Sequence, residues 1–219
     1  MSEGKKKIIT ISREYGSGGR LIGKRLAEKL GVPYYDKELL GRIAEESGYS
    51  REMMEDAEKK AKNGFLYSLA SAMGSGDGGP DSLSLNERFF LAQFDTIRKI
   101  AEEGSCVIVG RCADYILRDL PEATNVFVYA EEADKIKRAV EEYGVPEKEV
   151  KKTMKAADKA RENHYSYHTG RKWGNPVNYH LALDSGYLSI EDIVDMIITY
   201  TDKKISRIET TPATKEAAE

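Results

Sequence analysis

The chain has 219 residues and a net charge of −3, because 34 lysines and arginines are set against 37 aspartates and glutamates. This length suits one domain of ordinary size, and the balanced charge without a long basic run argues against a nucleic-acid partner. No stretch approaches the ~18 apolar residues of a membrane-spanning helix, and the apolar run after MSEGKKK is too short for a signal peptide, so we expect a cytoplasmic protein with no membrane partner.

The first elements of the chain are a strand, a glycine-rich turn and a helix. A β-branched run at Ile8–Ile11 predicts the strand, and apolar spacing from Arg20 to Leu30 predicts the helix. Glycines let the backbone turn with positive φ, and a helix N-terminus adds unpaired amides and the positive end of its dipole. The segment therefore predicts a loop that binds nucleotide phosphates. Its residues are Gly16, Ser17, Gly18, Gly19 and Arg20.

This loop departs from the usual phosphate-binding motif G-x-x-x-x-G-K-[ST]. Gly19 stands where the motif has its lysine, and no hydroxyl follows, because the next residues are Arg20 and Leu21. A shifted match that ends at Gly23-Lys24 would lie a full turn inside the helix, where the amides are already paired. We therefore reject that register, although Lys24 can still point toward the phosphates.

The rest of the chain alternates short apolar runs with segments of helical spacing, and Gly31 ends the first helix. Further strands are predicted at 32–35, 106–109, 125–130 and 180–184. Further helices are predicted at 37–46, 50–61, 86–104, 131–143, 146–168 and 189–201. Of the remaining segments, 65–73 fits a short helix or an apolar flap, 74–80 is a loop by composition, and the tail from residue 205 is predicted to fray.

Polar residues and glycines follow three of the predicted strands. The glycine loop follows the first strand, Asp36 the second, and Gly110-Arg111 the third. Alternating strands and helices predict a parallel sheet covered on both faces, and such sheets bind ligands at the carboxyl ends of their strands. We therefore expect these three features to meet in one phosphate-binding site.

Arg111 and Asp36 each have a functional and a structural interpretation. The Arg111 guanidinium is suited to hold a phosphate bidentately, or else lies on the surface or pairs with Asp114. Asp36 could accept hydrogen bonds from a substrate base or sugar, or join the water shell of a magnesium ion. Its structural role, which does not exclude the first, is to cap the helix that starts at Lys37.

The segment 152–172 is dense in cations on a helical frame. Asp158 and Arg161 lie three residues apart and therefore share one helix face. A solvated surface helix looks similar. However, the aromatic residues and glycine that follow favour a mobile basic segment that closes over phosphates and stabilises charge on the transferred group.

Cysteines and histidines do not predict a metal site. Cys106 and Cys112 are more typical of small buried residues than of a disulfide or metal ligands. The histidines at 164, 168 and 180 lack zinc spacing. His164 and His168 are one helical turn apart, and we favour packing or hydrogen bonding for both.

Four segments resemble the cytidylate kinase-like branch of the P-loop nucleoside monophosphate kinases. They are 8–40 with its Ser-Arg-x-x-Gly-Ser-Gly-Gly motif, VIVGRCADYIL at 107–117, Asp158-x-x-Arg161, and LALDSGYLSIEDIVDMI at 181–197. The resemblance implies a three-layer α/β/α P-loop fold with a five-stranded parallel sheet in the order 2-3-1-4-5. It further implies one kinase domain at 1–205, with a helical nucleotide-binding insert at 48–104 and a lid at 146–178, and a flexible tail at 206–219.

The resemblance also implies roles for individual residues. The glycine loop would hold the donor phosphates, Arg111 the acceptor phosphate, and Asp158 with Arg161 would belong to the lid. Since the lysine and hydroxyl of the motif are missing, Arg20 and Lys24 could supply the charge, and Ser17 or Ser12 the hydroxyl. The expected catalytic residues are Arg161, Arg20 and Lys24. The expected acceptor-binding residues are Asp36, Arg111 and Asp158.

The function implied is transfer of the ATP γ-phosphoryl group, with Mg²⁺, to a nucleoside monophosphate, with CMP or dCMP as the first expectation. No cytosine-reading motif is evident beyond the candidates Arg42 and Arg88, so a kinase for another small metabolite is an alternative. A second alternative is a nucleotide sensor whose degenerate loop binds phosphates without transferring them. The apolar residues of the 65–104 region permit either a substrate pocket or a homodimer surface; they are Phe65, Leu66, Phe89 and Phe90.

Overall fold

The computed structural model of this chain describes residues 5–36, 38–50, 52–53 and 84–210. The segment 65–73, the loop 74–80 and most of the helix predicted at 50–61 lie outside the described residues. Phe65 and Leu66 lie outside them too. A substrate pocket or homodimer surface at 65–104 therefore stays a prediction.

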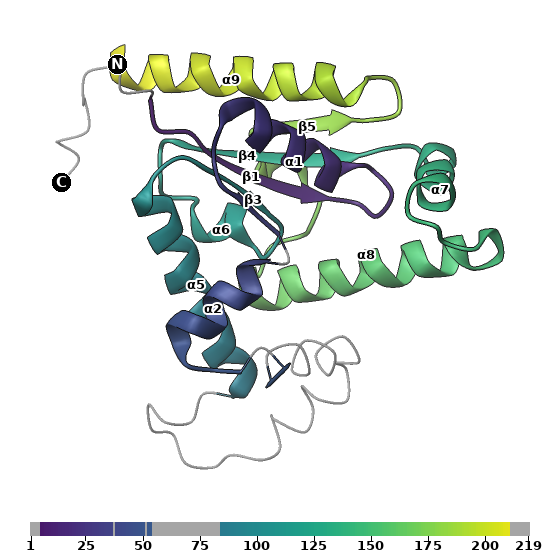
Figure 1. The fold of residues 1–219 in the computed structure, drawn as a ribbon, viewed down its shortest axis with the longest axis horizontal. Helices are drawn as coiled ribbons and strands as arrows, with labels where there is room; N and C mark the ends of the chain where they lie inside the picture. Colours follow the sequence, from purple (N-terminus) through teal and green to yellow (C-terminus); the bar gives the residue numbers. More distant parts are fainter. Residues whose placement is uncertain (1–4, 37, 51, 54–83, 211–219) are drawn as a thin grey trace.

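A parallel sheet of five strands forms the centre of the molecule (Figure 1). Its order is β2-β3-β1-β4-β5, and every neighbouring pair is parallel. This order confirms the predicted fold class. The strands are β1 (Ile8–Arg13), β2 (Tyr34–Tyr35), β3 (Cys106–Val109), β4 (Ala123–Tyr129) and β5 (Leu181–Asp184).

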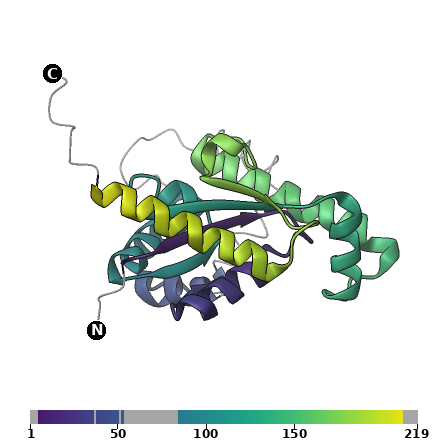
Figure 2. The same cartoon turned by 90° about the horizontal axis from the view of Figure 1, so that it is seen from above.

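Helices cover both faces of the sheet, as Figures 1 and 2 show. One face carries α1 (Gly19–Leu30) and α9 (Ile190–Thr210), and the other carries α2 (Glu38–Ser47), α5 (Leu85–Glu103) and α6 (Ala113–Ile116). A short 3-10 turn, η2 (Pro176–Asn178), precedes β5. Among the described residues, no helix is both long and apolar enough to cross a membrane.

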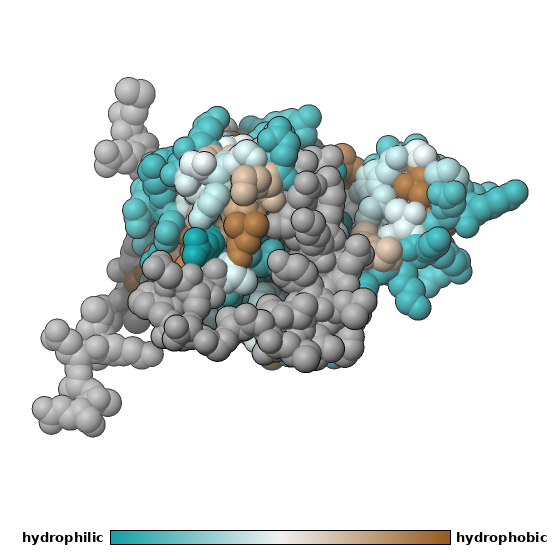
Figure 3. Space-filling view, turned by 90° about the horizontal axis from the view of Figure 1, so that it is seen from below, coloured by the Kyte–Doolittle hydropathy of each residue, from teal (hydrophilic) through white to brown (hydrophobic). Residues whose placement is uncertain are grey.

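The remaining helices, α7 (Glu132–Glu141) and α8 (Glu147–Thr169), extend past the sheet. In Figures 1 and 2, α7 and the first turns of α8 project beyond the carboxyl ends of the strands. Seen from below, this projecting end carries mostly hydrophilic residues (Figure 3). The later turns of α8 run back along the core, where Tyr165 is buried.

The central strand β1 explains why both layers form. Successive side chains of a strand point to opposite faces, and a parallel sheet is buried on both. Ile9 and Ile11 pack into the core beneath α1 and α9. Thr10 and Ser12 point to the other face, where the Thr10 hydroxyl donates to Asn125 (2.8 Å). β1 therefore contributes Ile9 and Ile11 to one core layer, and Ile8 together with the polar Thr10 and Ser12 to the other.

Several elements differ from the predictions, among them β1, α9 and α6. β1 continues to Arg13, two residues beyond the predicted end, because it pairs with β4 up to that residue. α9 continues to Thr210, although the sequence predicts a helix end at about 201 and fraying from 205. A buried Ile205 and a 2.6 Å ion pair between Asp202 and Lys7 stabilise these extra turns, so the predicted domain boundary at 205/206 falls inside α9. The four-residue α6 was not predicted.

Candidate phosphate-binding site

Glycines determine the shape of the loop between β1 and α1. Gly16 and Gly18 have φ of +80° and +76°, a region that other residues avoid. A Cβ on Gly16 would also lie 2.5 Å from the Lys135 carbonyl oxygen. Ser17 is buried, and its hydroxyl donates to a backbone carbonyl three residues earlier (2.9 Å). The predicted loop is thus a tight turn into the N-terminus of α1, where unpaired amides favour an anion.

Side chains from α7 and from the end of β5 hold this loop in place. Arg138 donates to the carbonyl oxygens of Gly16 (2.8 Å) and Ser185 (3.4 Å). The Ser185 hydroxyl in turn donates to the Ser17 carbonyl (2.6 Å). The sequence reasoning missed Arg138 and Ser185, because a charged residue on α7 has the same local pattern as any solvated helix face.

Asp36 lies beside the loop and faces two arginines. It is 7% exposed and forms ion pairs with Arg20 (2.6 Å) and Arg13 (3.6 Å). The Arg13 guanidinium occupies space that a Cβ on Gly110 would need. The ends of β1, β2 and β3 therefore meet, as expected. Contact of Asp36 with a substrate base or sugar stays a prediction.

Arg13 is a site residue that the sequence reasoning missed. It is the last residue of β1, and its side chain is 16% exposed. Burial, together with the charges of Arg161 and Arg20, lowers the pKa of Arg13 to about 10. The available signal was its place in the Ser-Arg-x-x-Gly-Ser-Gly-Gly motif, but an arginine at a strand end is typical of a surface until the neighbouring strands are placed.

Asp158 and Arg161 of α8 contact the same loop. The Asp158 carboxylate accepts a hydrogen bond from the Tyr15 amide (2.8 Å) and pairs with Arg161 (2.6 Å). The Arg161 guanidinium also lies 5.8 Å from the centre of the Tyr15 ring. Burial raises the pKa of Asp158, although its two partners favour the ionised form. The predicted pair is thus next to the glycine loop, and its role in closing over phosphates stays a prediction.

Arg111 lies in a strained turn after β3. Arg111 and Cys112 have φ of +58° and +54°, a conformation that is costly for residues other than glycine and that clusters at functional sites. The Arg111 carbonyl accepts a hydrogen bond from the Gln93 side-chain amide (2.9 Å). The Asp114 carboxylate, considered above as an ion-pair partner of Arg111, accepts a hydrogen bond from Tyr165 (2.7 Å). Binding of an acceptor phosphate by Arg111 stays a prediction.

Two other predicted cations differ in their surroundings. Lys24 is exposed one turn beyond Arg20 on α1, and it forms no ion pair with the part of the chain that the structure describes. Arg42 of α2 instead pairs with Glu46 (2.9 Å) and with Glu103 of α5. The pair with Glu103 joins α2 to α5 and gives Arg42 a structural role. Whether Arg42 also reads a cytosine base stays a prediction.

A buried polar cluster lies on the α6 face of the sheet. The Asp114 carboxylate accepts hydrogen bonds from Tyr165 (2.7 Å) and from Ser12 (3.4 Å). Burial raises the pKa of Asp114. The Ser12 hydroxyl is thus directed at Asp114, and the Ser17 hydroxyl at a backbone carbonyl. That either hydroxyl replaces the one missing from the loop motif stays a prediction.

Removing the Tyr165 hydroxyl is expected to make stability more sensitive to pH. Because burial raises the pKa of Asp114 in the folded protein, ionised Asp114 opposes folding, and stability present below its unfolded pKa is lost as the pH rises through the folded one. Tyr165 donates to the ionised form, so Tyr165→Phe should cost about 1–3 kcal/mol at pH 8 and less at pH 4.5. Urea denaturation at both pH values measures this. Tyr167→Phe, at an exposed position of α8, is the control, and an equal loss at both pH values would contradict the expectation.

The described residues contain no group of three or more His, Cys, Asp or Glu side chains that could hold a metal ion. Cys106 and Cys112 are free and buried, which confirms their predicted role. His168 stacks on Phe90 with ring centres 4.1 Å apart and meets His164 edge-on at 4.6 Å, which confirms packing for this pair. A magnesium ion needs few protein ligands, since it keeps several waters and binds through phosphates and one or two carboxylates. Asp36 is the buried carboxylate beside the loop that fits this.

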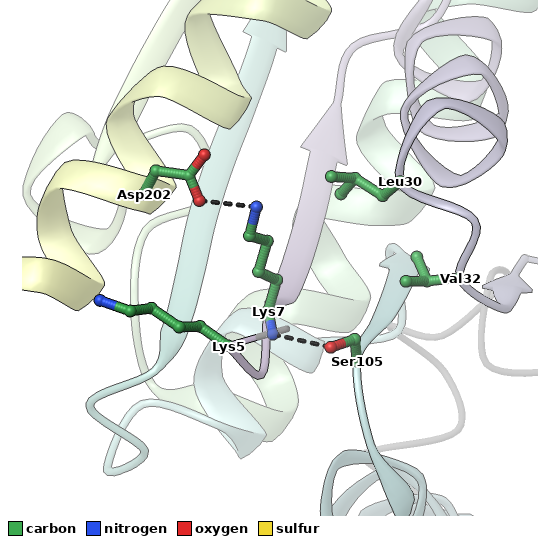
Figure 4. A pocket seen from close by; sticks show the side chains of 6 residues that line it. All are labelled: Lys5, Lys7, Leu30, Val32, Ser105 and Asp202. Carbon is green, nitrogen blue, oxygen red and sulfur yellow. Dashed lines mark hydrogen bonds and ion pairs between the residues drawn. The ribbon is translucent and has the colours of Figure 1, made fainter. Parts of the chain in front are cut away.

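A separate cavity of about 290 Å³ lies at the opposite end of the sheet (Figure 4). Its lining comes from residues that precede β1, β2 and β3 and from one residue of α9; they are Lys5, Lys7, Leu30, Val32, Ser105 and Asp202. The Lys7 side chain is paired with Asp202 (2.6 Å), and the Lys7 amide donates to Ser105 (2.9 Å). Ligands of parallel α/β sheets bind at the carboxyl ends of the strands, so this cavity is not part of the phosphate-binding site.

Comparison with known proteins identifies the family. The model of the cytidylate kinase-like family matches residues 8–187. The structure of an uncharacterized protein from Eubacterium ventriosum is 33% identical, with a TM-score of 0.68, over 90% of this chain and 99% of that one. A gluconokinase from Sinorhizobium meliloti shares the fold at 14% identity, with a TM-score of 0.51, over 93% of this chain and 96% of that one. No curated protein matches the chain. The chain therefore belongs to the cytidylate kinase-like family, and this membership supports phosphoryl transfer as the kind of reaction it carries out.

Proposed function

We propose that the protein transfers the γ-phosphoryl group of ATP to a nucleoside monophosphate, with CMP or dCMP as the first substrates to examine. The observation that carries this proposal is the convergence of basic groups at the glycine loop. Arg13, Arg20 and Arg161 come from β1, α1 and α8, and all lie near the carboxyl ends of the strands. Phosphoryl transfer depends mainly on positioned positive charge, which such a cluster supplies.

The loop and its arginines have separate tasks in this proposal. The amides at the start of α1 bind the donor phosphates, and Arg20 with Lys24 adds positive charge beside them. Arg161 stabilises negative charge on the group in transfer, and Asp158 positions Arg161 through their 2.6 Å ion pair. ATP, bound with Mg²⁺, supplies the phosphoryl group. Asp36 would hold the metal, directly or through water.

The acceptor is assigned to the side of the site near Arg111. A guanidinium at the end of β3 is suited to a phosphate on the acceptor, which favours a phosphorylated acceptor over a neutral one. The family description supports a cytidine nucleotide as the first candidate.

A nucleotide sensor is the second candidate, because Gly19 stands at the position of the missing lysine. Such a protein would bind ATP without transferring its phosphoryl group. The two candidates therefore predict different results in one assay.

Formation of ADP from ATP and Mg²⁺ in the presence of different acceptors tests the proposal. With CMP or dCMP we expect acceptor-dependent ADP formation at ~1–100 s⁻¹, the usual range for kinases. The other nucleoside monophosphates and small hydroxylated metabolites form the comparison panel. Turnover with a hydroxylated metabolite but with no nucleoside monophosphate would show that the proposed acceptor is wrong. ATP binding without turnover on any acceptor would contradict transfer and favour the sensor.

A further inference from the structure

The motif position that normally carries a lysine is filled here by another side chain. A Cβ on Gly19 would lie 2.5 Å from Cβ of Arg13 and 2.9 Å from its Cγ. Real Cβ atoms do not approach one another so closely, so the stem of Arg13 takes the space where a side chain at position 19 would begin. Position 19 must therefore be a glycine if Arg13 is to keep this position, and the glycine is more than the absence of a lysine.

A second glycine gives the same side chain its path. The Arg13 guanidinium fills the space that a Cβ on Gly110 would need, and Gly110 has φ of +77°. Two glycines from different segments, Gly19 and Gly110, thus leave the space that the side chain of Arg13 occupies. This arrangement directs the guanidinium across the end of the sheet, between the glycine loop and the turn after β3.

The surroundings of Arg13 suit an anion better than a structural ion pair. Its Nε is buried without a hydrogen-bond partner among the described residues, and its contact with Asp36 is 3.6 Å long. Asp36 lies closer to Arg20, at 2.6 Å. Buried charges are ordinarily paired and hydrogen-bonded, because an unsatisfied one is costly. A guanidinium presents five N–H donors in a planar fork that matches phosphate oxygens.

We propose that Arg13 carries out the task of the missing lysine and binds the terminal phosphates of the nucleotide. This inference rests on the proposed function for the identity of the ligand, and on the packing of Arg13 against Gly19 for the residue. Compared with the usual motif, the cationic group comes from the end of β1 and not from the start of α1. Arg20, whose carboxylate contact is already short, is then the supporting charge.

Binding of AMP, ADP, ATP and tripolyphosphate, measured by titration calorimetry, tests the proposal. Arg13→Gln should weaken ATP and tripolyphosphate about 10- to 100-fold, the loss of one hydrogen bond to a charged group, and change AMP binding less than about threefold. Arg13→Lys, which keeps the charge without the fork, should lie in between. Arg25→Gln is the control, because this exposed arginine of α1 pairs with Glu191 and Glu28.

A double substitution tests the steric part of the argument. Gly19→Lys alone should lower the melting temperature, because the new side chain collides with Arg13. Combined with Arg13→Gly, which removes the Cβ that lies 2.5 Å away, it should fit and recover ATP binding relative to Arg13→Gly alone. A Gly19→Lys variant with normal stability and binding would overturn this packing argument.

The outcomes separate this inference from the proposed function. A wild type that binds ATP, with an Arg13→Gln variant that binds it equally well, overturns the role of Arg13 and leaves the proposed function standing. Equal weakening of AMP and ATP in that variant also overturns it, since the loss would then not concern the terminal phosphates. A wild type that binds neither ATP nor tripolyphosphate overturns both.

Discussion

Replacing Arg161 by alanine is expected to lower kcat about 10³-fold, with a much smaller change in KM. The guanidinium lies over the glycine loop, 5.8 Å from the ring of Tyr15, and Asp158 fixes its position. A charge held in this way costs little reorganisation when negative charge develops on the transferred group. Its loss should therefore affect the transition state more than the bound substrates.

Steady-state ADP formation over a range of ATP and acceptor concentrations measures both constants. Lys159→Ala is the matched control, because this cation of α8 is exposed and pairs only with Glu162 among the described residues (2.9 Å). It should leave kcat within about twofold of the wild type. A fall in kcat of less than about tenfold for Arg161→Ala, with turnover otherwise intact, would remove Arg161 from the catalytic residues.

Substituting alanine for Gly16 is expected to destabilise the protein by about 2–5 kcal/mol. The left-handed backbone at φ +80° accounts for about 1–2 kcal/mol of this. The remainder comes from the clash of the new Cβ with the Lys135 backbone, which lies 2.5 Å away and cannot rotate aside. The loop and α7 would have to separate, so nucleotide binding should weaken as well.

Gly31→Ala separates these two contributions. Gly31 has a similar φ of +65°, but a Cβ there would meet nothing within 4 Å. Its substitution should cost only the backbone part, about 1–2 kcal/mol, with nucleotide binding unchanged. Urea denaturation of both variants gives the comparison. Equal losses for the two glycines would show that the contact between the loop and α7 does not contribute.

The features predicted correctly are those that depend on short stretches of sequence. Local features of this kind are the β-branched run of β1, the glycines of the loop and the cap at Gly31. They were sufficient to predict the first strand, the turn and the first helix in their order along the chain. The family resemblance supplied the order of the strands. The end of α9 was wrong because Ile205 is buried only through contacts with distant parts of the chain, while its neighbours in sequence are polar.

The candidate site was predicted only in part, for a related physical reason. The glycine loop and the Asp158–Arg161 pair could be identified because motifs contain them, and Asp36 because it follows a predicted strand. Arg138 lies in none of these motifs, and Arg13 lies in one that does not reveal its role. Both roles depend on packing across strands and helices that are far apart in sequence. A charge acquires such a role from the backbone it faces, and single-sequence patterns carry little information on that.

The hydrogen bond from Tyr15 to Asp158 has a consequence for how this enzyme family can diverge. The donor is a main-chain amide, which every residue except proline possesses. The side chain at position 15 can therefore change without removing the link between the loop and α8. Position 158 has no such freedom, because only a short acceptor of this reach keeps the link. Substitutions at position 158 are thus expected to change how α8 is held against the loop, whereas substitutions at position 15 are expected to keep this hydrogen bond and to change only the contacts of the ring.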